Sequence, residues 1–216
     1  MAAAARTDHA LERLVFFSDA VFAIAITLLV IELHPPHLPM GSPDSAYWIA
    51  LAHLWPSLLG YFISFAVIGL FWMGHHRAFA LSGRYSPEVL PWNMGLLLTI
   101  GFMPFVTALL ASNLYARPPA LLYCGAMLSA SLFNLKVVHV ATGPDMVDPA
   151  AEAEDIAYVR RRSLSVVLGS GIAVLLGFVL PQMAQAGLVS IPIWRRILTR
   201  GRGAPRGRPA AKRARR

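Results

Sequence analysis

The sequence predicts an all-α, polytopic membrane protein with six transmembrane helices. Hydrophobic residues make up 56% of the 216 residues and charged residues only 14%, against roughly 25% charged residues in soluble domains. Apolar runs of about 20 residues, the length that crosses a bilayer, recur along the chain. Lys and Arg gather in the segments on one side of these runs. Such a chain has too little polar surface to cover itself in water, whereas lipid contacts apolar side chains directly.

Five apolar runs have the length of a membrane span, and a sixth is shorter. The first carries Asp19 and Glu32 and is followed by a proline-rich loop, so we do not interpret it as a cleavable signal peptide. The sixth contains Pro192, Arg195 and Arg196, so a five-span layout is the main alternative. The runs are residues 14–33, 48–73, 90–112, 120–140, 163–180 and 187–198.

The distribution of positive charge favours six spans with both termini in the cytoplasm of a cell-membrane protein. The outer loops would then be residues 34–47, 113–119 and 181–186, which hold only Arg117. A five-span layout would place ten Lys and Arg residues of the C-terminal end outside, against this rule. The positive residues placed inside are Arg6, Arg13, Arg77, Arg84, Arg160, Arg161, Arg162 and those of residues 195–216.

The C-terminal end differs in composition from the rest of the chain. Residues 195–216 contain ten Lys and Arg and no acidic residue, with Gly, Pro and Ala between them. We therefore expect a membrane domain over 1–200 and a disordered basic tail over 201–216. Such a tail is expected to contact anionic lipid rather than nucleic acid.

The acidic side chain within the first span is the strongest local signal. A carboxylate inside an apolar helix costs roughly 2.5–3.5 kcal/mol on insertion, so Asp19 needs a partner from another helix. The end of the second run offers Trp72, His75, His76 and Arg77 on the same side of the membrane. These groups are consistent with a structural hydrogen-bond network, a proton relay or a metal site. The adjacent histidines diverge by about 100° on a helix, which disfavours chelation of one metal ion.

A second face of the first span is apolar apart from one hydroxyl. Ile24, Thr27, Leu28 and Ile31 fall within roughly a 100° arc of the helical wheel, and Asp19 lies roughly 140° from Ile24. Such a face is typical of contact with lipid or with another helix. It also fits a pore wall, in which branched alkyl groups narrow the path and Thr27 supplies oxygen atoms.

Signatures of catalysis are absent from the sequence. There is no phosphate-binding loop, no nucleotide fingerprint and no Ser-His-Asp spacing. Cys124 is the only cysteine, which excludes an internal disulfide and a cysteine-based metal centre. We therefore expect neither an enzyme nor a bound cofactor or metal.

The first hundred residues resemble a known family. Arg13, the Phe-Ser-Asp of residues 17–19 and the apolar residues 21–29 are similar to the signature of the transmembrane protein 175 family, as are Trp72-x-x-His75 and Asn93. That family comprises endosomal and lysosomal potassium channels and shorter prokaryotic relatives. The resemblance extends over the remaining chain in hydropathy alone.

The resemblance implies a function and roles for individual residues. It implies one six-helix repeat, a homotetramer, and a first helix that lines a central pore permeable to potassium. Ile24 would form a hydrophobic constriction and Thr27 a hydroxyl layer, on the same face as Leu28 and Ile31. The alternative from another class is a proton-linked carrier that uses Asp19 and His75. The residues implied to support the pore helix are Arg13, Ser18, Asp19, Trp72, His75 and Asn93.

Overall fold

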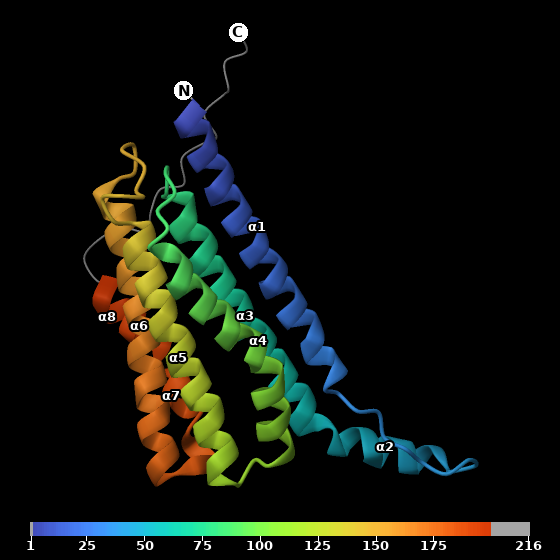
Figure 1. Ribbon diagram of the computed structural model, residues 1–216. Helices are drawn as coiled ribbons and strands as arrows, with labels where there is room; N and C mark the ends of the chain where they lie inside the picture. Colours follow the sequence, from blue (N-terminus) through green and yellow to red (C-terminus); the bar gives the residue numbers. More distant parts are fainter. Residues whose placement is uncertain (1, 200–216) are drawn as a thin grey trace.

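The computed structural model describes residues 2–199, with side chains from His9 onward, and every regular element in that range is a helix (Figure 1). The predicted all-α class is thereby confirmed. Five of these helices are long and apolar enough to cross a membrane. The helices are α1 (Ala2–Ile31), α2 (Asp44–His53), α3 (Trp55–Ala80), α4 (Val89–Ser112), α5 (Arg117–Ala141), α6 (Ala153–Val179), a 3-10 turn (Pro181–Met183), α7 (Ala186–Val189) and α8 (Ile191–Thr199).

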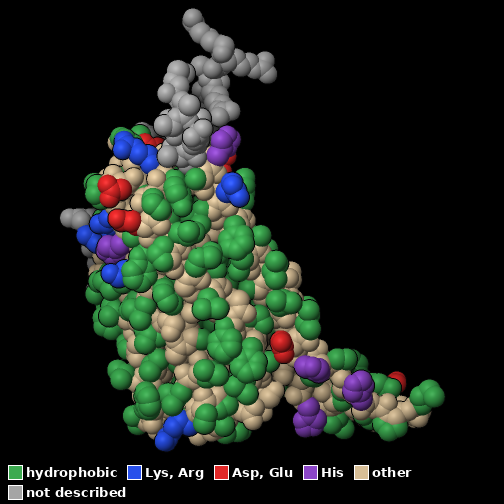
Figure 2. All heavy atoms as spheres, viewed as in Figure 1, with side chains coloured by type: hydrophobic (Ala, Val, Ile, Leu, Met, Phe, Trp, Pro, Cys, Tyr) green, Lys and Arg blue, Asp and Glu red, His purple; other side chains and the backbone are tan. Residues whose placement is uncertain are grey.

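The long helices pack as one bundle, with α1 at its side. Helices α4, α5 and α6 pack successively, and α3 crosses beside α4 and α5. Helix α1 contacts only α3 and α4 extensively, so much of its surface remains uncovered (Figure 1). Figure 2 shows hydrophobic side chains over the middle of the visible face, whereas most Lys, Arg, Asp and Glu gather near the end where the N-terminus lies. That pattern suits a bundle whose middle contacts lipid.

The second predicted span starts later than the sequence indicated. The apolar run 48–73 was expected to form one helix, but the structure divides it between α2 and α3 at Leu54. Pro56 lies in the first turn of α3, where its missing N–H is tolerated, and it disfavours continuation of the preceding helix. Helix α2 has no buried residue and extends away from the bundle at the end opposite the N-terminus (Figure 1).

The fifth predicted span also begins earlier than expected. Helix α6 starts at Ala153, before the predicted start at residue 163, and its first turns contain Arg160, Arg161 and Arg162. The guanidinium of Arg160 donates to the hydroxyl and carbonyl oxygens of Thr142 at 2.9 and 3.0 Å, which ties α6 to the end of α5. Hydropathy placed the start of this span at Ser163 because the first turns of α6 are polar.

The sixth predicted span does not form one continuous helix, and it is not among the five helices long and apolar enough to cross a membrane. Gly187 packs against Ala173, and Ile191 packs against Gly169, so the chain returns antiparallel along α6. It does so as two short helices, α7 and α8, separated at Ser190. Pro192 contributes to this interruption because it has no N–H to donate to the carbonyl oxygen of Leu188, as a continuous helix would require. The tail predicted over 201–216 lies outside the described residues.

Candidate ion pathway and its support network

Helix α1 has two faces with different surroundings. One face is fully packed against α3 and α4 and consists of Leu14, Ser18, Phe22, Ala25 and Leu29, which are all buried. These positions recur at three- and four-residue intervals, as on one side of an α-helix. The packed face fixes which side of α1 is turned away from the bundle.

The face predicted to line a pore is the one that α1 turns outward. Ile24 is 57% exposed, Leu28 40% and Ile31 67%. Thr27 is exposed between them, and its hydroxyl donates to the Ile24 carbonyl oxygen at 2.8 Å. Because this bond uses the hydroxyl hydrogen, the lone pairs of the Thr27 oxygen are free to face a cation.

Buried polar side chains connect the packed face of α1 to two other helices. The Nε2 atom of His75 lies 2.9 Å from Oδ1 of Asn93, and Nδ2 of Asn93 donates to Oγ of Ser18 at 2.9 Å. Ser18 in turn donates to the Leu14 carbonyl oxygen at 2.8 Å. If Nε2 carries the His75 hydrogen, the donors and acceptors form one continuous series. His75 of α3 then donates to Asn93 of α4, and Asn93 donates to Ser18 of α1. The exposed fraction is zero for Ser18, His75 and Asn93.

A second connection to α3 uses the acidic residue of α1. The indole Nε1 of Trp72 donates to a carboxylate oxygen of Asp19 at 2.8 Å. The imidazole of His76 stacks on the Trp72 ring, with centroids 5.6 Å apart, and does not share the buried position of its neighbour His75. The structure thus brings five of the six expected support residues together. Arg13 is exposed, and no described residue forms a hydrogen bond or ion pair with its side chain.

Two features of this region were missed by the sequence interpretation. Phe17 lies seven residues before Ile24 and is 53% exposed, so it continues the outward face by two turns. Its seven-residue spacing could have revealed it. Ser64 of α3 and Thr107 of α4 also form a buried hydrogen bond of 2.7 Å between their hydroxyls. No spacing within the sequence indicates that pair, because its partners come from separate helices.

Comparisons with known proteins all point to one family. Residues 13–104 match the family described as "Endosomal/lysosomal potassium channel TMEM175". A potassium channel of Chamaesiphon minutus is 38% identical over 154 residues, which are 69% of this chain and 75% of that protein. A potassium channel of Streptomyces collinus is 32% identical over 182 residues, covering 81% of this chain and 87% of that protein. The chain belongs to the TMEM175 family.

A solved structure of a TMEM175 homolog has a similar fold over most of this chain. The crystal structure of a lysosomal potassium-selective channel TMEM175 homolog from Chamaesiphon minutus matches with a TM-score of 0.73 and 30% sequence identity. The match covers 89% of this chain and 99% of that chain, and therefore extends well beyond residues 13–104. The resemblance noted in the sequence is confirmed, and the family is one of membrane channels rather than enzymes.

Proposed function

We propose that this chain is one subunit of a homotetrameric, potassium-permeable channel in the cell membrane, with α1 around the pore axis. The observation that carries the proposal is the outward face of Ile24, Thr27, Leu28 and Ile31 on a helix whose other face is held by buried polar bonds. The relatives named potassium channels support the choice of ion. One chain supplies one such helix, so several copies must meet to enclose a pore.

The Ile24 side chains would act as the constriction. Four branched alkyl groups around a narrow axis exclude water, and an ion that has lost its hydration shell is strongly disfavoured there. The gate would open when the α1 helices part or rotate. The buried bonds through Asn93 and Asp19 would keep Ile24 facing the axis in the closed arrangement.

Thr27 would act one turn further along the same face. Its oxygen carries no net charge, so it can replace part of a cation's hydration without trapping the ion. The sequence lacks the TVGYG segment that supplies rings of backbone carbonyls in other potassium channels. Selectivity would therefore arise from hydroxyl oxygens and pore width.

The constriction is tested by Ile24→Asn in reconstituted bilayers. We expect a larger single-channel current or open probability, because an amide side chain stabilises water in the narrow segment. Val30→Asn is the matched control, since Val30 is also aliphatic and 52% exposed but lies roughly 120° from Ile24 on the wheel. Equal currents from the Ile24→Asn variant and the parent would exclude Ile24 as the constriction.

The hydroxyl layer is tested by Thr27→Val in bi-ionic potassium and sodium salt. We expect the reversal potential to move toward zero, because the substitution removes the oxygen and retains the shape of the side chain. Thr99→Val on α4 removes a hydroxyl that bonds only within its own helix, and it should leave the reversal potential unchanged. A Thr27→Val channel with parental selectivity would contradict the assignment.

One observation keeps a proton-linked carrier as the second candidate. Nδ1 of His75 is buried and has no hydrogen-bond partner among the described residues. A group that exchanged protons there would alter the bond between His75 and Asn93. Discrete current steps without accompanying proton flux would favour the channel, whereas a saturating flux coupled to protons and lost in His75→Gln would favour the carrier.

A further inference from the structure

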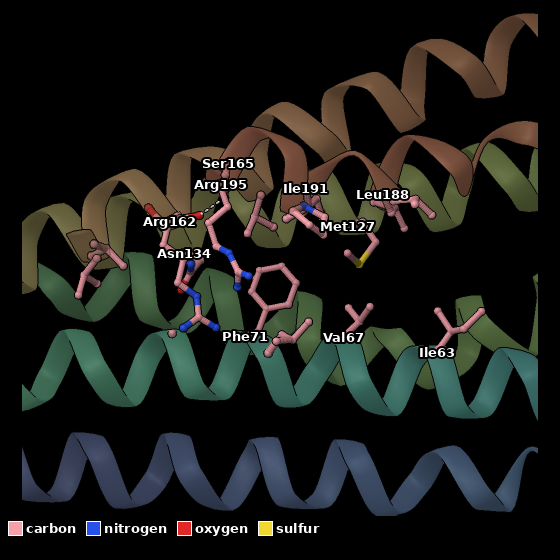
Figure 3. Close-up of a pocket in the computed structure, with 18 of the residues that line it drawn as sticks. Ile63, Val67, Phe71, Met127, Asn134, Arg162, Ser165, Leu188, Ile191 and Arg195 are labelled. Atoms are coloured by element: carbon pink, nitrogen blue, oxygen red, sulfur yellow. Dashed lines mark hydrogen bonds between the residues drawn. The ribbon is translucent and has the colours of Figure 1, made fainter. Parts of the chain in front are cut away.

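An apolar groove lies on the side of the bundle away from α1. It is a cavity of about 460 Å³ between α3, α5, α6 and the returning segment of α7 and α8 (Figure 3). Its walls are aliphatic and aromatic over most of their length. Residues that form these walls include Ile63, Val67, Phe71, Met127, Leu188 and Ile191.

Three arginines from three different helices line the same groove. Arg77 lies three residues before the end of α3, Arg162 lies on α6 and Arg195 lies on α8. Figure 3 shows the Arg162 and Arg195 side chains together beside Phe71. No acidic residue lines the groove, and no described residue forms an ion pair with any of the three guanidinium groups. This end of the groove therefore has a concentrated, uncompensated positive charge.

A buried amide at the charged end also lacks a partner. Asn134 of α5 lines the groove close to Arg162 and Arg195 (Figure 3) and is only 4% exposed. Its Oδ1 has no hydrogen-bond donor among the described residues. Leaving such a group unpaired costs about 1–3 kcal/mol. The arrangement therefore suits a ligand that combines an anionic group with a hydroxyl donor.

We propose that this groove binds one anionic phospholipid of the bilayer, with its phosphate at the three arginines and an acyl chain along the apolar walls. A glycerol headgroup would supply a hydroxyl for Asn134, so phosphatidylglycerol has the appropriate chemistry. Arg77 and Ile63 are 14 residues apart on α3, or roughly 21 Å at 1.5 Å per residue. The groove is therefore longer than the hydrocarbon layer of one leaflet, which is roughly 15 Å, or half of the 30 Å core. An acyl chain of one leaflet can lie along it.

Charge distinguishes this ligand from two other occupants. The chain's own residues 200–216 contain eight Lys and Arg and no acid, so the three arginines would repel them. The phosphate of a zwitterionic lipid is accompanied by an ammonium group, which the same arginines disfavour.

The test is native mass spectrometry of the full-length oligomer released from detergent. The protein is titrated with phosphatidylglycerol, and separately with phosphatidylcholine that has the same acyl chains. The variants are Arg162→Gln and Arg195→Gln at the charged end and Val67→Trp, which fills the apolar part. Arg161→Gln is the matched control, because Arg161 lies on the same helix but does not line the groove. Inorganic phosphate in excess is added as a competitor.

The parent and the control should retain phosphatidylglycerol and not phosphatidylcholine. Each groove arginine variant should bind about tenfold more weakly, as expected for loss of one charge-assisted hydrogen bond. Val67→Trp should also weaken binding while the oligomer stays intact. Equal retention of both lipids, an equal loss in Arg161→Gln, or full displacement by phosphate would overturn the proposal. Dissociation of the oligomer by Val67→Trp would identify the groove as a subunit contact and would overturn it as well.

Discussion

The side-chain amide of Asn93 serves two neighbours at once, since its oxygen faces His75 and its nitrogen donates to Ser18. Both neighbours are fully buried, so water cannot replace Asn93 in either bond. A half-satisfied polar network is costly in a medium of low dielectric constant. The bonds are also directional, and a rotation of α1 about its axis would break the one to Ser18. Asn93 thus controls the stability of the bundle and the orientation of α1 together.

We expect Asn93→Leu to lower the unfolding temperature markedly. The substitution leaves His75 and Ser18 without partners, and each unpaired buried group costs about 1–3 kcal/mol. Thermal unfolding followed by tryptophan fluorescence in detergent measures the effect. Thr99→Val, also polar to apolar on α4, removes only bonds within its own helix and serves as the control. If both variants unfold at the same temperature, the inter-helix bonds of Asn93 do not stabilise the protein.

Close packing of backbone holds the returning segment on α6. A Cβ atom added to Gly187 would lie 2.4 Å from the backbone of Ala173, which no real Cβ contact tolerates. Small residues allow membrane helices to approach to this extent. Since α7 has only four residues and α8 nine, neither is long enough to be a stable helix alone. Their position therefore depends on contact with α6.

Gly187→Ala should detach or displace this segment. We expect a destabilisation of about 1–3 kcal/mol, as for overpacking in a dense core, and greater protease sensitivity near residues 184–190. Gly171→Ala on α6 is the control, because nothing lies within 4 Å of its added Cβ, and its higher helix propensity should leave stability equal or greater. Equal stability of the two variants would show that the close approach at Gly187 is not required.

The whole molecule has one polar, positively charged end and one end with few charges. The N-terminus, the inner end of α3 and the start of α6 lie together at the charged end (Figure 1). The loop after α3 is joined there to the loop after α5, since the Gly83 and Arg84 amides both donate to the Met146 carbonyl oxygen. The positive-inside rule predicts that this end faces the cytoplasm and that α2 lies at the outer surface.

Cysteine labelling in intact cells tests that orientation. In a Cys124→Ala background we expect Ser45→Cys, on the exposed α2, to react readily with an impermeant maleimide. Ala150→Cys, in the exposed loop before α6, should react only after the membrane is permeabilised. The two positions are compared under identical conditions. Labelling of Ala150→Cys in intact cells with protection of Ser45→Cys would reverse the topology.

Several features of the site could be predicted because they depend on one helix. That Ile24, Thr27, Leu28 and Ile31 share one face of the first span follows from helical periodicity alone. The need of Asp19 for a partner follows from the cost of a carboxylate in an apolar span. Periodicity could not show which side chain bonds to Asp19. Of the candidates Trp72, His75, His76 and Arg77, it is Trp72 that donates to the carboxylate in the structure. The packing of α3 against α1 and α4 likewise determines that His75 is buried whereas His76 is exposed.

The sequence by itself determined the membrane class, the approximate spans and the two faces of α1, because hydropathy and helical periodicity are local properties of the chain. The tertiary structure alone decided where α2 separates from α3, how the last segment folds back along α6 and which polar atoms meet. The groove between α3, α5, α6 and α8 shows why these features needed the tertiary structure, since its residues come from distant parts of the chain. Arg77, Arg162 and Arg195 are each ordinary inner-end charges in the sequence, and only the packing of three helices places them around one cavity.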